Sequence, residues 1–257
     1  MKVAWLTHHL PRETDSEHPA HLPGKYVGGA EMTDADLIAA KPEEVEISVF
    51  DPTQWEQAME LDHIIITGTD LLRDEAMIAL SKKNPTVFIH HQQSPNLARM
   101  HLIDSSRVLI VHTPAHEALE RKWTDPKRVE HVLSPLDISE CRIEPKQNHA
   151  VWAQRVHDLK GPRTAAMWAA RQGLELLMIT NRPRSEVLAA MAVAKYYVHL
   201  PLGFESESRA TIEAVLSGCE CVVNDKVGLT SVPRWNDREY LKELVTQAAD
   251  KWWKVAI

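Results

Sequence analysis

The feature that most constrains this chain is a regular alternation of short apolar, β-branched runs with longer amphipathic stretches. Such runs, bounded by turn residues, predict buried strands, and the amphipathic stretches between them predict helices. Strands that are joined through helices lie parallel in one sheet, so the sequence predicts an α/β fold. In the first half of the chain, the predicted strands cover residues 2–7, 46–50, 63–67, 86–90, 107–111 and 128–133, and the first helix covers residues 31–40.

A change of composition at residues 138–148, which are polar and lack periodicity, predicts a linker. A chain of 257 residues is long enough for two compact domains. We therefore predict an N-terminal domain at 1–138, a C-terminal domain at 149–235 and a terminal segment at 236–257. The later predicted strands are 150–153, 174–180, 196–200 and 220–224, and the helices are 161–172, 185–194, 208–217 and 238–253.

Composition excludes several classes of protein. Hydrophobic residues make up 44% of the chain and charged residues 25%, as in soluble globular proteins. A net charge of −7 argues against a surface devoted to nucleic acid, although a local basic groove stays open. The three cysteines lack the paired spacing of a disulfide framework or a zinc site. We found no signal peptide and no apolar run of membrane-spanning length, so we expect a cytoplasmic protein.

Two glutamates flank the start of the predicted helix at 208–217. Glu205 lies in the turn after a predicted strand, and Glu213 lies inside the helix. A helix N-terminus favours phosphate, and carboxylates beside it are suited to hold sugar hydroxyls. The alternative is a turn residue and an exposed helix residue without function. One segment upstream is rich in cations, which indicates an anionic ligand. The alternative is that half of these residues lie on solvated helix surfaces. They are Arg155, Lys160, Arg163, Arg171, Arg182 and Arg184.

The segment HLPLGFESESRATIEAVLSGCECVVNDKVG resembles the nucleotide-sugar site of retaining GT-B glycosyltransferases of the family 4 type, also called glycosyl transferases group 1. The matching positions are Pro201, Glu205, Glu213, Ala214, Gly218 and Gly228. AQRVHDLKG, residues 153–161, is similar to the G-R-L-x-x-x-K-G motif of the family, with Arg155 and Lys160 at the same separation. YVGGAE at 26–31 supplies Gly28 and Gly29, and TVFIHHQQ at 86–93 supplies a strand-ending His90, with His91 as the alternative.

The resemblance implies a GT-B fold, in which two Rossmann-like domains face each other across a cleft and the terminal segment packs back on the first domain. Two departures stand out. Ser206, Glu207 and Ser208 replace the usual Gly-Phe-Gly after Glu205, which leaves the sugar open. The stretch between Lys160 and Glu205 is short, so the second domain is predicted to be reduced by one strand–helix unit, as in small virus-encoded enzymes.

The resemblance also implies the roles of the residues. Arg155 and Lys160, with the amides of 206–209, stabilise the leaving diphosphate. Glu205 contacts the donor sugar and Glu213 holds the ribose, while His90 reaches the sugar and the acceptor. The expected donor-binding positions are Gly28, Gly29, Glu205, Ser206, Glu207, Ser208, Arg209 and Glu213, with Asn181 and Arg182 as candidates for the nucleobase pocket.

The implied function is retaining transfer of a hexosyl group, glucosyl first, from a nucleoside diphosphate sugar, UDP-sugar first, to a hydroxyl. Hydroxymethylated pyrimidine in phage DNA is one candidate acceptor, which would place the enzyme in a host cytoplasm. The alternative acceptors are a glycan, a lipid-linked sugar or a small metabolite. The alternative function is that of a non-catalytic domain that only binds sugar nucleotides. The sequence leaves the oligomeric state, and a viral or cellular source, open.

No metal is expected to take part. Asp34 and Asp36 have the D-x-D spelling of a metal site, but they lie inside a predicted helix rather than after a strand. His112 and His116 have the spacing of a helical metal pair, but Pro114 separates them. The expected reaction therefore needs no cofactor besides the sugar nucleotide.

Overall fold

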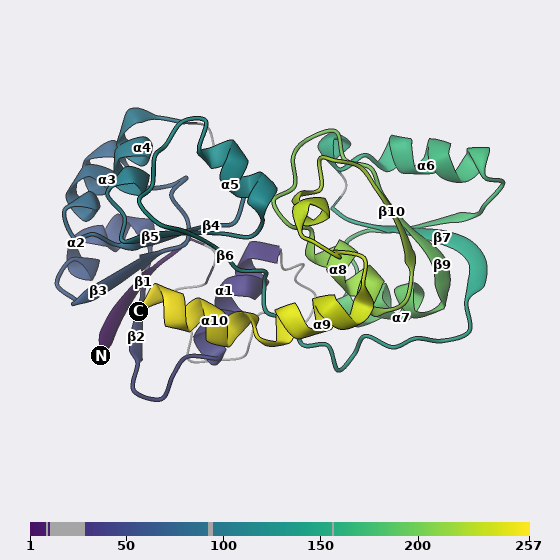
Figure 1. The fold of residues 1–257 in the computed structure, drawn as a ribbon, viewed down its shortest axis with the longest axis horizontal. Helices are drawn as coiled ribbons and strands as arrows, with labels where there is room; N and C mark the ends of the chain where they lie inside the picture. The colour runs from purple at the N-terminus through teal and green to yellow at the C-terminus, as the bar shows by residue number, and fades with distance from the viewer. Residues whose placement is uncertain (9, 11–28, 92–94, 156) are drawn as a thin grey trace. The chain divides into compact units, whose positions relative to one another are not determined.

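The computed structural model describes residues 1–8, 10, 29–91, 95–155 and 157–257, which form two compact units (Figure 1). The N-terminal unit contains the described residues up to Pro135 together with Gln247–Ile257, and the C-terminal unit contains Leu136–Thr246. Each unit is built on one parallel β-sheet. We describe the two units separately.

The N-terminal unit contains a six-stranded sheet with the order β2-β1-β3-β4-β5-β6, and all of its strand pairs are parallel. Its strands are β1 (Lys2–Leu6), β2 (Glu46–Phe50), β3 (His63–Ile66), β4 (Thr86–Ile89), β5 (Val108–Val111) and β6 (Val129–His131). Its helices are α1 (Gly29–Ala39), the 3₁₀ helix η2 (Pro52–Gln54), α2 (Trp55–Ala58), α3 (Asp74–Ser81), α4 (Leu97–Asp104), α5 (Pro114–Glu120) and α10 (Ala248–Ala256).

Both faces of this sheet are covered, which explains why its central strands are apolar throughout. Every residue of β4 and β5 is buried. Successive side chains of a strand point to opposite faces, so alternate residues of β4 belong to different clusters. Val87 and Ile89 pack with Met77 of α3 and Leu102 of α4 on one face. On the other face, Phe88 packs with Leu37 of α1 and with Trp252 and Trp253 of α10.

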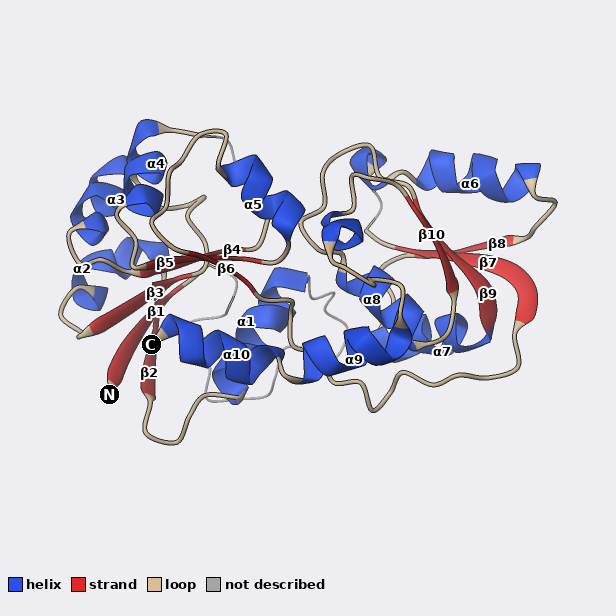
Figure 2. Ribbon diagram, viewed as in Figure 1, coloured by secondary structure: helices blue, strands red, loops and turns tan. Residues whose placement is uncertain are grey.

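The C-terminal unit contains a four-stranded parallel sheet with the order β10-β9-β7-β8 (Figure 2). Helices α7 and α8 cover one face of this sheet and α6 covers the other. The strands are β7 (Gln147–Ala153), β8 (Leu176–Ile179), β9 (Ala194–His199) and β10 (Glu220–Val223). The helices are the 3₁₀ helix η3 (Asp158–Lys160), α6 (Pro162–Arg171), α7 (Arg184–Val193), α8 (Arg209–Leu216), the 3₁₀ helix η4 (Gly228–Ser231) and α9 (Arg238–Thr246).

The predicted helix at 238–253 is wrong in one respect, because it is two helices separated at Gln247. The buried residues Leu241 and Val245 of α9 belong to the C-terminal unit. Helix α10 belongs to the N-terminal unit, where Trp252 lies against Trp5 with ring centroids 5.1 Å apart. The predicted terminal segment at 236–257 is thus divided between the two units, since the apolar stripe of each half is buried in a different core.

Two other features of the chain bear on the earlier expectations. Strand β7 begins at Gln147, inside the predicted linker, and pairs with Ala194 of β9 before a register shift.

None of the helices among the described residues has the length and apolar character needed to span a bilayer.

Candidate functional site

The predicted donor-side residues of the C-terminal unit follow the carboxyl ends of its parallel strands, which is where α/β sheets bind their ligands. The segment after β7 carries Arg155 and Lys160, and the loop after β8 carries Asn181 and Arg182. The loop after β9 carries Glu205 and leads into α8. Because the strands are parallel, these loops leave the sheet at the same edge.

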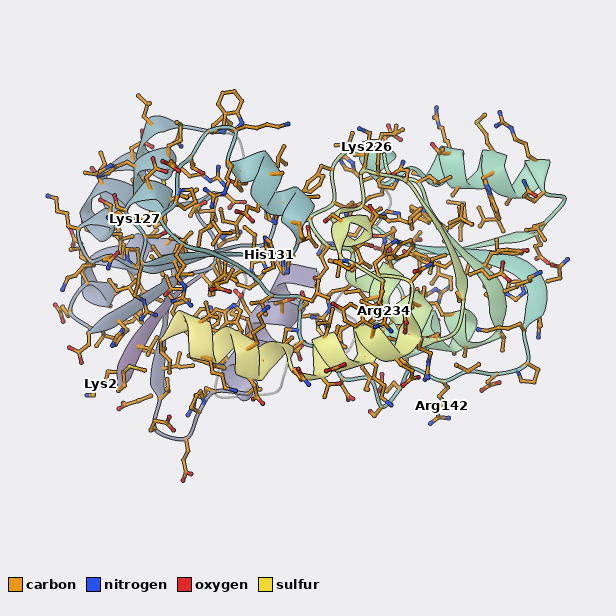
Figure 3. All side chains as sticks on the ribbon, in the orientation of Figure 1. Lys2, Lys127, His131, Arg142, Lys226 and Arg234 are labelled. Carbon is orange, nitrogen blue, oxygen red and sulfur yellow. The ribbon has the colours of Figure 1, made fainter. Side chains whose placement is uncertain are left out.

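Lys160 and Glu205, which come from different loops, form an ion pair between Nζ and Oε1. The side chain of Glu205 is 12% exposed and that of Lys160 is 32% exposed. The Glu205 backbone is held as well: its N–H donates to the Lys226 carbonyl at 2.9 Å, and its carbonyl accepts from the Gly228 N–H at 2.6 Å. Lys226 is labelled in Figure 3, in the loop after β10.

Gly161 explains how Lys160 is placed beside Glu205. Its φ is +72°, a left-handed conformation that suits glycine. A Cβ at this position would lie 2.0 Å from the Leu200 carbonyl oxygen. The segment after β7 therefore touches the backbone after β9 at a point where only a hydrogen fits. The Leu202 N–H extends this contact by donating to the Leu159 carbonyl at 2.8 Å.

His199 lies next to Glu205 and was not singled out from the sequence. Its side chain is fully buried, and Nε2 lies 3.6 Å from Glu205 Oε1. Neither ring nitrogen has a hydrogen-bond partner among the described residues. The pKa of Glu205 lies below its ordinary value: burial raises it, but His199 and the charge of Lys160 lower it by more. The carboxylate is therefore held in its charged form.

The turn from Glu205 into α8 is tightly built. Ser206 and Glu207 are buried. Ser208 is the residue before the helix and has φ +73°, an uncommon conformation for a residue with a side chain. Its hydroxyl lies 2.8 Å from the Thr211 hydroxyl, and its carbonyl accepts from the Thr211 N–H. Arg209 is the first residue of α8, so the amides of this turn stand at the positive end of the helix dipole.

Glu213 is buried in α8 and pairs with Arg184, the first residue of α7. Arg184 Nε donates to Glu213 Oε1 at 2.8 Å. The same guanidinium donates from Nη1 to Glu140 and from Nη2 to the Asp137 carbonyl, both at 2.8 Å. The pKa of Arg184 is raised, because the effect of Glu213 outweighs burial, which lowers it.

The two glutamates share one arrangement. Each receives its cation on Oε1: Glu205 from Lys160, and Glu213 from Arg184. Oε2 of either residue accepts no hydrogen bond from any residue that the structure describes. Each carboxylate is thus fixed through one oxygen and retains acceptor capacity on the other. This arrangement can bind hydroxyl groups through the second oxygen of each glutamate.

Three other residues that were predicted to bind the sugar nucleotide take no part in these two ion pairs. Arg155 is exposed, in the segment after β7. Asn181 is exposed and has φ +52°. Arg182 has a side chain that is 63% exposed, and its Nη1 lies 3.8 Å from Glu186 Oε2. The structure gives these three no contact with Glu205 or Glu213.

In the N-terminal unit, His90 belongs to a buried polar network around Asp34. His90 Nε2 lies 2.8 Å from Asp34 Oδ1. Asp34 Oδ2 accepts from the hydroxyls of Thr7 at 2.8 Å and Thr67 at 2.7 Å. Thr7, Thr67 and His90 directly follow β1, β3 and β4. The Asp34 side chain on α1 therefore hydrogen-bonds to the C-terminal ends of three strands. This network fixes the ring plane of His90.

The other predicted positions of the N-terminal unit are Gly28, Gly29 and His91. Gly28 lies outside the described residues, and Gly29 begins α1, where its carbonyl accepts from the Thr33 hydroxyl at 2.8 Å. His91 is exposed, and its Nε2 lies 3.0 Å from Asp70. The pKa of Asp70 is lowered to about 2, because His91 outweighs the effect of burial, which raises it.

A second buried polar group lies around His116. Helix α5 begins at Pro114, so His112 precedes the helix and its ring stacks on that of His116, with centroids 6.4 Å apart. Arg99 and Glu120 form an ion pair at 2.8 Å, with side chains that are each 3% exposed. Burial, with smaller contributions from His112 and Arg99, lowers the pKa of His116 to about 2.

Comparison with known proteins finds no match to any family model and none to any curated protein sequence. Solved structures do match. Sucrose-phosphate synthase from Thermosynechococcus elongatus has a TM-score of 0.67 at 12% identity, over 99% of this chain and 96% of its own. Anabaena Alr3699/HepE in complex with UDP and glucose has a TM-score of 0.62 at 13% identity, over 100% of this chain and 92% of its own.

A third similar structure is an alpha-glucosyltransferase in complex with UDP and a 13-mer DNA that contains an HMU base. Its TM-score is 0.51 at 14% identity, over 100% of this chain and 95% of its own. At these identities the likeness establishes the fold. The predicted α/β class is confirmed: the chain has the fold of GT-B glycosyltransferases, with four strands in its second sheet.

Three residues of these sites were missed from the sequence as partners of the predicted ones. Arg184 was grouped only with the general cation cluster, and Asp34 was weighed only as a metal ligand. His199 reads as part of a buried strand. One signal was available, since Asp34 stands on an apolar stretch of helix where a charge needs a partner.

Proposed function

We propose that this protein is a glycosyltransferase that moves a hexosyl group, glucosyl first, from a UDP-sugar to an acceptor hydroxyl with retention of configuration. The observation that carries this proposal is the pair of glutamates before and within α8, Glu205 and Glu213, each of which is held by a cation through one oxygen only. The likeness to HepE, whose structures hold UDP and UDP-glucose, supports a uridine nucleotide as the donor.

In this proposal the diphosphate binds the amides of 206–209 at the start of α8. Lys160 turns from Glu205 to the leaving phosphate, and Arg155 adds a second positive charge. The oxygen of Glu205 that Lys160 releases then accepts hydrogen bonds from the donor sugar hydroxyls. Glu213 holds the ribose through Oε2, with Asn181 and Arg182 near the nucleobase. Charge stabilisation of the departing diphosphate is the main catalytic effect.

His90 takes the same part that the sequence resemblance implies, contact with the donor sugar and the acceptor. Its ring is oriented by Asp34, so a hydrogen bond from a sugar hydroxyl would meet a pre-set imidazole. The donor phosphate is proposed to take the acceptor proton, so no protein side chain is assigned as general base. No metal or further cofactor is needed in this proposal, and the reaction takes place in the cytoplasm.

For the acceptor we propose a hydroxymethylated pyrimidine in DNA. The support is the likeness to the alpha-glucosyltransferase that was crystallised with UDP and HMU-containing DNA. The second candidate is a glycan, a lipid-linked sugar or a small metabolite, which the net charge of −7 favours because DNA binding depends on cations. The candidate without catalysis is a domain that only binds the sugar nucleotide.

A thermal-shift screen with UDP, UDP-glucose and other nucleotide sugars tests the donor. A ligand at a hundred times its Kd stabilises the folded state by about 2.7 kcal/mol, which raises Tm by several degrees. Lys160→Met and Glu213→Gln are expected to reduce the shift clearly, since a tenfold loss of affinity removes about 1.4 kcal/mol of this stabilisation. Arg142→Met is the matched control, because Arg142 is exposed and points away from the C-terminal sheet in Figure 3. No shift with any nucleotide at millimolar concentration would refute the donor site.

Turnover separates the remaining candidates. An enzyme releases UDP from UDP-glucose, faster with its acceptor present, whereas a binding domain releases none. Labelled sugar is offered to DNA with hydroxymethylated pyrimidines, to the same DNA without the modification, and to a panel of glycans and small hydroxyl compounds. Label on the modified DNA alone supports the DNA acceptor. Label only on the glycan panel would transfer the proposal to the second candidate.

A further inference from the structure

Arg184 uses all three nitrogens of its guanidinium at one point of the C-terminal unit. Nε donates to Glu213, Nη1 to Glu140 and Nη2 to the Asp137 carbonyl, each at 2.8 Å. Its side chain is 23% exposed, and the bond to Glu213 is the partly buried one of the three, while the other two face solvent. A planar guanidinium that is held at three points cannot rotate, and a lysine could not reproduce these directions. Arg184 is therefore a rigid donor.

The consequence falls on Glu213, whose side chain is 9% exposed. A carboxylate at this depth is costly unless a cation or hydrogen-bond donor accompanies it. Arg184 supplies both, and it does so from one side, on Oε1. Oε2 accepts no hydrogen bond from the described residues, so the pairing leaves one carboxylate oxygen available with a fixed direction.

We propose that Arg184 is a positioning residue that aims Oε2 of Glu213 at the ribose diol of the donor nucleotide. This inference rests on the proposed function, in which Glu213 holds the ribose. Carboxylates bind ribose hydroxyls in other nucleotide-binding α/β folds, where geometry decides the strength of the bond. Arg184 acts through Glu213 and need not touch the ligand itself.

The test compares UDP with 2′,3′-dideoxy-UDP, which has the same base and diphosphate but no diol. Calorimetry gives the Kd of both ligands for each variant. The wild-type protein is expected to bind UDP about tenfold more tightly, as for hydrogen bonds to a charged acceptor. In Arg184→Met this ratio is expected to fall to near one through weaker UDP binding, while the Kd of the dideoxy ligand changes less than twofold.

A merely structural role for Arg184 would weaken both ligands together and leave the ratio intact. Arg184→Lys keeps the charge without the planar fork, and is also expected to lower the ratio. It serves as the second variant if Arg184→Met does not fold. Arg142→Met should leave both constants unchanged, since Arg142 is exposed and points outward (Figure 3).

The outcomes are distinguishable. A wild-type protein that binds neither ligand refutes the proposed function, and this inference falls with it. If the wild-type protein prefers UDP and the variants at Arg184 retain that preference, only the positioning role is overturned. If Glu213→Gln lowers the ratio and Arg184→Met lowers it equally, the two residues act as one unit, as the shared hydrogen bond requires.

Discussion

The imidazole of His90 lies 2.8 Å from the Asp34 carboxylate, and the two side chains are 3% and 0% exposed. Asp34→Ala removes the acceptor for His90 and for two threonine hydroxyls at once. We expect the free energy of unfolding to fall by about 3 kcal/mol or more, because buried donors lose their partner. Urea denaturation measures this change. Glu43→Ala, at an exposed carboxylate, should change it by less than about 0.5 kcal/mol.

Gly161→Ala tests the contact between the backbones after β7 and β9. The new Cβ would meet the Leu200 carbonyl oxygen at 2.0 Å, so the segment that carries Lys160 must move. Gly173→Ala is the matched control, because Gly173 has φ +65° and nothing within 4 Å of its added Cβ. The control is expected to cost about 1 kcal/mol for the left-handed backbone, and Gly161→Ala clearly more. Equal losses in thermal denaturation would contradict the contact.

The sequence predicted the central strands because burial on both faces leaves an unbroken apolar run, as in β5. It also predicted that Lys160 and Glu205 lie together, and the two side chains form an ion pair. Arg184 could not be chosen over Arg182, since only the folded chain shows which one reaches Glu213 across 29 positions. The break at Gln247 was hidden for a similar reason: the helical period continues through it, and only tertiary packing separates α9 from α10.

His116 gives a pH dependence with a definite sign. Its pKa is about 2 in the folded state, against an ordinary 6.5, so the folded protein excludes a proton that the unfolded chain binds. The contribution of His116 to the free energy of unfolding is therefore constant above about pH 6.5. Below that pH it falls by about 1.4 kcal/mol per pH unit.

His116→Leu should therefore flatten the curve of unfolding free energy between pH 6.5 and 4.5, whatever its effect at neutral pH. Urea denaturation across this range gives the slope. Carboxylates whose pKa is lowered in the folded state, such as Glu205, also lose stabilising free energy as the pH falls. They remain in the variant, so their contribution to the slope stays. His101→Gln, at an exposed helix position, should leave the slope unchanged. Parallel curves for His116→Leu and the wild type would refute the prediction.

Trp252 of α10 is expected to be the strongest single stabiliser in the terminal helix. Its ring is 1% exposed and lies 5.1 Å from Trp5 and 5.9 Å from Phe88, centroid to centroid. Trp252→Ala should lower the free energy of unfolding by about 3–5 kcal/mol, the usual cost of emptying such a site. Trp123, which is 53% exposed, provides the control. Similar losses for both substitutions in urea denaturation would show that α10 adds little to the core.

Helix α10 also sets the order in which the chain can mature on the ribosome. The N-terminal sheet cannot complete its second face until α10 has been synthesised, because Trp252, Trp253 and Ala256 belong to that core. The main chain of residue 256 also accepts a hydrogen bond from Thr86 of β4. The half of the protein that is translated first must therefore wait, partly open, while the half translated second can reach its final form ahead of it.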